Sequence, residues 1–140
     1  TSGPRNDLRL RQGERGHPRV ALIVDDDPES TRLLTHCLAK AFDPLFASNI
    51  RQARSCIEST HAIHLAFVAH DLPDGIGTQV LERLAARHPS CARVLTSRWD
   101  RGALPLGPLD LAHIFLSKPL HTPLVEAIQR VAIGPGQLNK

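Results

Sequence analysis

The sequence lacks long hydrophobic runs, and it has only three cysteines. No apolar stretch approaches the roughly 20 residues that a membrane-spanning helix requires, and no signal peptide is recognisable. The odd number of cysteines, without a pairing motif, argues against a disulfide framework. The eight histidines show no spacing typical of structural zinc. We therefore expect a soluble, cytoplasmic protein that does not contact a membrane.

The chain also lacks a strong charge of either sign, since its net charge is only +3. That value does not by itself imply a nucleic-acid partner. Residues 1–18 hold four arginines among glycines and prolines, a composition typical of a flexible basic leader or linker. A basic arm that binds nucleic acid is the alternative, but no aromatic residues interleave with the arginines and no recognition helix follows. We expect no nucleic-acid binding through the domain at 19–133, and a frayed tail at 134–140.

What the sequence does contain is five short apolar runs that alternate with amphipathic segments. The predicted strands are residues 20–24, 44–47, 63–69, 92–96 and 114–117. The predicted helices are residues 28–41, 51–59, 77–87 and 123–131. This alternation predicts βαβ units, hence a parallel sheet with helices on both faces. A chain of 140 residues suits one such domain.

The segment before the last predicted strand breaks this alternation. A helix is expected near residues 99–112, but the window contains two glycines and two prolines. Because an interior proline costs a helix about 3 kcal/mol, we expect this fourth helix to be short, irregular or replaced by a loop. Trp99 is the only tryptophan. Two interpretations of it stay open, a contact residue for a partner and a packed anchor for the altered helix.

Polar or small residues lie at the carboxyl ends of four predicted strands. They are Asp25 and Asp26, Ala69, Thr96 and Ser97, and Lys118. In a parallel sheet these ends share one edge, so the side chains should converge. Carboxylates bind a hard cation, whereas a hydroxyl and an ammonium bind phosphoryl oxygens. Helix capping is the alternative role for the acidic pair, but Asp27 already occupies the capping position before Pro28.

These motifs, in this order, resemble the receiver domain of bacterial two-component response regulators over residues 19–132. The motifs that carry the resemblance are residues 24–28, Leu72-Pro73-Asp74 with Gly77, residues 95–97 and residues 115–120. The resemblance implies a flavodoxin-like, doubly wound five-stranded parallel sheet of order 2-1-3-4-5.

The resemblance also implies roles for individual residues. Asp25 and Asp26 match the metal-binding acidic pair, and Asp71 matches the loop residue whose backbone carbonyl reaches the metal. Thr96 matches the switch hydroxyl and Phe115 the switch aromatic. Lys118 matches the invariant lysine, whose bond to the following proline is usually cis in the family.

One position departs from the family pattern. In receivers the phosphoacceptor aspartate lies four residues before the loop proline and eight before the loop glycine. Counting back from Pro73 and from Gly77 leads to Ala69 in both cases. Alanine has no nucleophilic oxygen and cannot form an acyl phosphate. With two carboxylates instead of three opposite one lysine, we expect no bound cofactor and only weak binding of Mg²⁺.

The resulting interpretation is a degenerate receiver, a pseudo-receiver that is not an enzyme. It would act in two-component (phosphorelay) signal transduction through phosphorylation-independent protein–protein contact. The expected partners are a histidine kinase, an output domain or a second copy of the chain. The alternative is a working receiver, phosphorylated by a histidine kinase, in which Ala69 replaced the aspartate by engineering.

Overall fold

The computed structural model describes residues 19–98 and 112–133. Three expectations lie outside the described residues. They concern the leader at 1–18, Trp99 with the fourth helix near 99–111, and the tail at 134–140. Within the described ranges, no helix is both long and apolar enough to cross a membrane.

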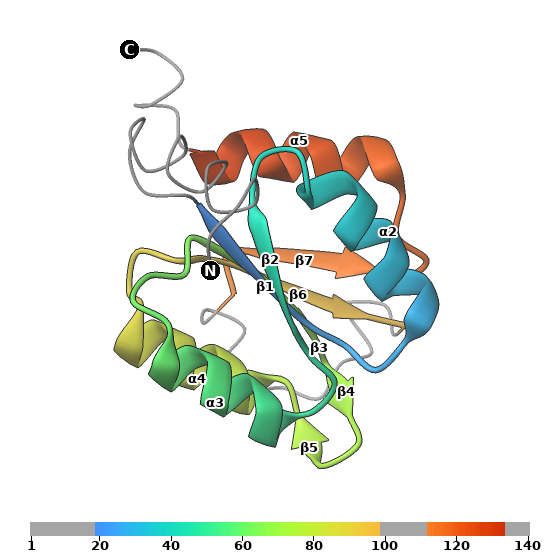
Figure 1. The fold of residues 1–140 in the computed structure, drawn as a ribbon. Helices are drawn as coiled ribbons and strands as arrows, with labels where there is room; N and C mark the ends of the chain where they lie inside the picture. Colours follow the sequence, from blue (N-terminus) through green and yellow to red (C-terminus); the bar gives the residue numbers. More distant parts are fainter. Residues whose placement is uncertain (1–18, 99–111, 134–140) are drawn as a thin grey trace, which may run out of the picture.

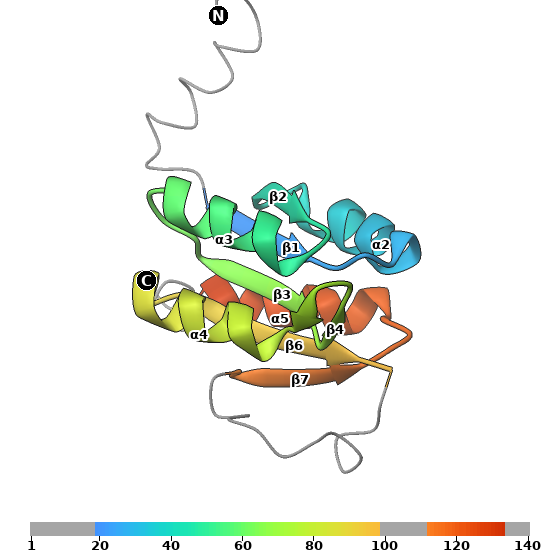
Figure 2. The same cartoon turned by 90° about the horizontal axis from the view of Figure 1, so that it is seen from below.

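The described part of the chain is built on a five-stranded sheet in which every neighbouring pair of strands is parallel. The strands are β1 (Val20–Val24), β2 (Asp43–Ala47), β3 (Leu65–Ala69), β6 (Ala92–Ser97) and β7 (Ile114–Ser117). Their order is β2-β1-β3-β6-β7, which Figure 2 shows along the sheet. This is the flavodoxin-like order that the resemblance implied.

Helices cover both faces of the sheet. They are α2 (Pro28–Leu38), α3 (Ile50–Ser59), α4 (Thr78–Arg87) and α5 (Thr122–Ile133). Helices α2 and α5 pack together on one face, and α3 and α4 pack together on the other (Figure 1). Each face has its own buried apolar cluster. All five residues of β3 are buried, because a central parallel strand is covered on both sides.

Local signals explain where α2 begins. Asp27 is the N-cap, and its carboxylate accepts hydrogen bonds from the Glu29 N–H (3.1 Å) and the Ser30 hydroxyl (2.9 Å). Pro28 follows at the first helical position, where its missing N–H costs nothing. The predicted end at Ala41 is wrong, because the helix ends at Leu38. The chain turns there, so that Phe42 enters the core while Ala41 stays exposed.

The loop after β3 contains a small antiparallel hairpin that the sequence did not predict. Its strands are β4 (Asp71–Leu72) and β5 (Gly75–Ile76). Gly77 closes the loop, since its N–H donates to the His70 carbonyl at 2.7 Å. A Cβ atom at position 77 would overlap the backbone carbonyl of Ala69. The loop and the end of β3 therefore pack backbone against backbone, which only glycine permits.

Candidate functional site

The residues singled out in the sequence lie at the carboxyl edge of the sheet. Asp25 follows β1, Ala69 ends β3, and Lys118 follows β7. Thr96 lies opposite Ala69 in the register of β6 and β3. Parallel strands that end together thus place an acid, a methyl group, a hydroxyl and an amine around one end of the sheet.

A buried ion pair joins two of these side chains. The Lys118 Nζ lies 2.9 Å from Asp25 Oδ2 and 3.1 Å from Asp25 Oδ1. The two side chains are only 10% and 2% exposed. Burial raises the pKa of Asp25, although the Lys118 ammonium and the Asp27 N–H, both of which donate to its carboxylate, oppose that rise. The Lys118 ammonium is therefore the counter-charge of the buried acid and donates a hydrogen bond to Oδ1, whereas Oδ2 has no hydrogen-bond partner among the described residues.

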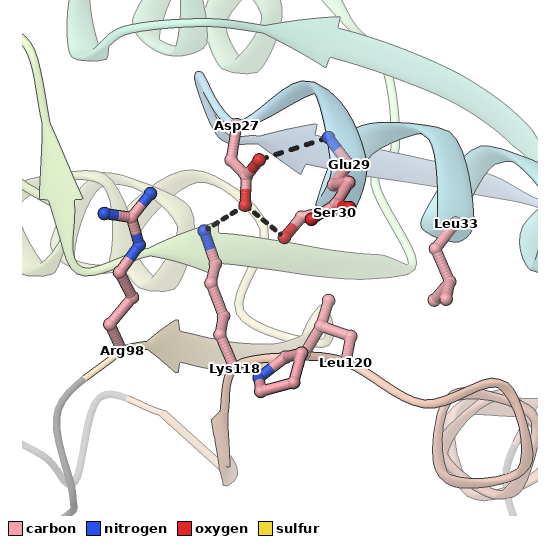
Figure 3. Close-up of a pocket in the computed structure, with 8 residues that line it drawn as sticks. Asp27, Glu29, Ser30, Leu33, Arg98, Lys118 and Leu120 are labelled. Carbon is pink, nitrogen blue, oxygen red and sulfur yellow. Dashed lines mark hydrogen bonds and ion pairs between the residues drawn. The ribbon is translucent and has the colours of Figure 1, made fainter.

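Asp27 is a second acidic neighbour of Lys118, and the sequence analysis had assigned it only a capping role. Its Oδ2 lies 3.5 Å from Nζ, and a dashed line marks this contact in Figure 3. Partial burial acts to raise the pKa of Asp27, but the Ser30 hydroxyl, the Glu29 N–H and the Lys118 charge outweigh it, and the pKa is lowered. The run of three aspartates was the signal for this role, because the helix start folds back toward the end of β7.

Lys118 lines two cavities. The larger, of about 480 Å³, lies between the start of α2 and the chain after β7 (Figure 3). The smaller, of about 250 Å³, lies over the ends of β3 and β6 and is lined by Ala69, Thr96 and Ser97, among others. Arg98 lines both cavities together with Lys118. Sequence reasoning missed Arg98, which follows directly on the Thr96–Ser97 pair.

The smaller cavity is where a receiver would hold its phosphoacceptor. The Ala69 side chain is 3% exposed and offers only a methyl group. The Thr96 residue is 1% exposed, and its Oγ1 has no hydrogen-bond partner among the described residues. An unpaired buried hydroxyl is uncommon. Here it faces a position whose side chain is too short to reach it.

The other acidic candidates do not fill that place. Asp26 lines the smaller cavity but is exposed. The Asp71 side chain is 64% exposed, and its Oδ1 lies 3.0 Å from His70 Nδ1. His70 is buried and also lines the cavity. The two carboxylates thus stand at the rim, and one of them is engaged by an imidazole.

The remaining candidates have mainly packing roles in the structure. Phe115 is half-buried and packs against the apolar cluster on the α3 and α4 side of the sheet. The peptide bond between Lys118 and Pro119 is cis, as the resemblance implied. Within the described ranges, no three His, Cys, Asp or Glu side chains are grouped so that they could hold a metal ion.

Asp74 belongs to the loop motif that carried the resemblance, but its structural role was not predicted from the sequence. Its two carboxylate oxygens accept the N–H groups of Ile50 (2.8 Å) and Arg51 (3.1 Å) at the start of α3. The hydrogen bond from Ile50 is the main cause that lowers the pKa of Asp74. Since these partners are more than twenty residues away in sequence, only the fold reveals the contact.

Comparison with known proteins agrees with this geometry. No protein-family model matches the chain. An alignment over 106 residues, which covers 71% of the chain, is 30% identical to the response regulator protein PilR of Pseudomonas aeruginosa. The match covers 23% of that protein, so the chain spans about a quarter of its curated relative.

Solved structures give the same answer for the fold. A two-component response regulator from Clostridium difficile superimposes with a TM-score of 0.75 at 22% identity, over 87% of this chain and 99% of that one. A CheY-like receiver domain protein from Methanospirillum hungatei gives a TM-score of 0.73 at 22% identity, over 86% and 97%. The chain has the receiver-domain fold and is similar in sequence to a response regulator, which confirms the resemblance carried by its motifs.

Proposed function

We propose that this chain is a pseudo-receiver of two-component signalling, which acts through protein–protein contact and does not accept a phosphoryl group. The observation that carries the proposal is Ala69, a methyl group at the end of β3 inside the cavity where a receiver presents its reactive carboxylate. Transfer of a phosphoryl group requires an attacking oxygen in line with the leaving group, and alanine supplies none.

Neighbouring carboxylates are poorly placed to replace the missing one. Asp71 points to the His70 ring and is mostly exposed. Asp25 is held by Lys118 in a buried ion pair. Because in-line attack depends on the position of the oxygen to within about an ångström, an oxygen elsewhere on the rim does not substitute for one at residue 69.

The same arrangement argues for weak metal binding. Receiver pockets bind a divalent cation through their acidic residues, and here only the Asp25 and Asp26 carboxylates and the loop at Asp71 remain for it. Asp25 already has Lys118 as its counter-charge. A hard cation would compete with that ammonium and would find fewer charged oxygen ligands. We expect Mg²⁺ to bind weakly and the domain to catalyse no reaction of its own.

Without a covalent signal, the domain would keep one conformation or change it only when a partner binds. A ligand shifts a conformational equilibrium only by its differential affinity for the two states. The partners we propose are a histidine kinase, an output domain, or a second copy of the chain. A measurement of molecular mass at several protein concentrations tests self-association directly.

The decisive experiment treats the chain with acetyl phosphate and Mg²⁺ and measures its intact mass. The expected result is no stable gain of one phosphoryl group. Such a gain on the chain as it stands would refute the proposal.

A matched variant, Ala69→Asp, tests the rest of the pocket. If the variant is phosphorylated, Lys118, Thr96 and the acidic pair are still competent, and the alternative of a working receiver that has lost only its acceptor is favoured. If the variant stays unmodified, the pocket has diverged beyond residue 69.

A further inference from the structure

Two histidines occupy equivalent positions at the amino-terminal edge of the sheet, opposite the candidate site. His64 directly precedes β3, and His113 directly precedes β7. The Nδ1 atom of His64 accepts the backbone N–H of Val20 at 3.0 Å. The Nδ1 atom of His113 accepts the backbone N–H of Arg93, also at 3.0 Å.

Each histidine also bonds its partner through the backbone. The His64 N–H donates to the Val20 carbonyl at 2.9 Å, and the His113 N–H donates to the Arg93 carbonyl at 2.8 Å. In both places the imidazole thus takes up an N–H at the start of a neighbouring strand, while the backbone completes a second bond. The same pair of hydrogen bonds, one to the ring and one to the backbone, therefore joins β1 to β3 and β6 to β7 at the amino-terminal edge.

The protonation state of the rings decides whether these contacts exist. An Nδ1 atom that accepts a hydrogen bond must carry a lone pair, so its proton lies on Nε2 and the ring is neutral. A protonated imidazole carries N–H groups on both nitrogens. It would face the N–H of Val20 or Arg93 with another donor, and the bond would be lost.

The surroundings oppose protonation. Burial lowers the pKa of His64, and the Arg19 guanidinium and the His88 ring add to that effect. His113 is more exposed, but partial desolvation of its ring still lowers its pKa, and the Arg93 guanidinium acts in the same direction. Because the pKa values in the closed edge lie below the ordinary value of 6.5, opening the edge favours proton uptake.

We propose that His64 and His113 form a pH-sensitive closure of the amino-terminal edge of the sheet: as neutral rings they hold the starts of β1 and β6, and acid opens both contacts. The sign follows from linkage. A group whose pKa is lowered in the closed form stabilises that form above pH 6.5 and loses this contribution as the pH falls. The proposal does not depend on the proposed function.

Amide hydrogen exchange of the whole chain tests the proposal at the two partner amides, Val20 and Arg93. Their protection factors should fall between about pH 7.5 and pH 5.0, by up to about tenfold, which corresponds to the loss of one neutral hydrogen bond. The fall should be smaller at Arg93, because its acceptor His113 is more exposed than His64. Amides in the middle of β3, such as Phe67, should lose much less. An equal loss at all sites would indicate general acid unfolding and would overturn the proposal.

Substitutions distinguish the loss of the hydrogen-bond acceptor from the protonation of the histidine ring. In His64→Asn and His113→Asn an amide oxygen can take the place of Nδ1 without titrating, so protection should stay high at both pH values. In His64→Ala the protection of the Val20 amide should be low at both pH values, because the acceptor is gone. The exposed His61 provides a control, since His61→Asn should leave the pH response unchanged.

Nitrogen-15 shifts of the two rings at about pH 7.5 give an independent reading that needs no variant. They should show the Nε2–H tautomer for both histidines. A proton on Nδ1 in either ring, or a pH response that persists in the asparagine variants, would refute the closure.

Discussion

The two ends of the sheet are held together by different chemistry. At the carboxyl edge, the contact between distant segments is a buried ion pair, Lys118 with Asp25. At the amino edge, neutral imidazoles accept backbone N–H groups. An ion pair tolerates no loss of one partner, because the other is left as a buried charge. When an imidazole at the amino edge is protonated, only one neutral hydrogen bond to a backbone N–H is lost. The candidate site therefore lies at the edge of the sheet whose stability depends on a pair of opposite charges.

The largest effect we expect comes from breaking the ion pair. Lys118→Met should lower the free energy of unfolding at neutral pH by about 3–5 kcal/mol, because it leaves the Asp25 carboxylate buried without a counter-charge. Denaturant unfolding measures the loss. It should shrink as the pH falls, since the raised pKa of Asp25 allows the native state to take up a proton. The double variant that adds Asp25→Asn should recover much of the stability, and a loss that persists in the double variant would contradict the argument.

The next largest effect comes from adding a charge to the same edge. The chain itself should bind Mg²⁺ with a dissociation constant above about 1 mM, whereas Ala69→Asp should bind it at least about tenfold more tightly, because a third carboxylate joins the site. Calorimetry or NMR titration measures both constants. Submillimolar binding by the unaltered chain would refute the expectation of a weak site.

A smaller and more local effect is expected at the loop beside the site. Asp74→Ala removes the acceptor of the Ile50 and Arg51 N–H groups, and the exchange rates of these two amides should rise by up to about tenfold. Hydrogen exchange measures this change. In the unaltered chain the contact should weaken only below about pH 3.8, because the pKa of Asp74 is lowered in the folded state. Asp74→Asn, which keeps one acceptor oxygen, should give an intermediate rate.

The smallest effect on overall stability should come from the amino edge. Between pH 7.5 and 5.0, the denaturation midpoint should fall slightly more for the unaltered chain than for the double variant His64→Asn with His113→Asn, because only the former loses its caps in acid. Parallel denaturant titrations measure the difference. If the asparagine variant is the more acid-sensitive of the two, the contrast between the edges is wrong.

Much of the fold could be predicted because its signals are local. Apolar runs marked the strands, and Asp27 with Pro28 marked the start of α2. The end of that helix could not be predicted from pattern alone, because Ala41 continues the apolar stripe while the larger Phe42 takes the buried place. In the site, the rule that parallel strands end together brought Asp25 and Lys118 to one edge. The bonds of Asp74 to α3 and of His64 to Val20 join segments far apart in sequence, and no local pattern encodes them.

Gly77 makes the position of the loop beside the smaller cavity independent of the side chain at residue 69. Because the loop backbone rests directly on the carbonyl of residue 69, the loop is held beside that position by main chain rather than by the side chain of residue 69. A different side chain at position 69 should therefore leave this loop contact in place. The domain is thus a ready scaffold for installing a new reactive or ligand-binding group at a single site.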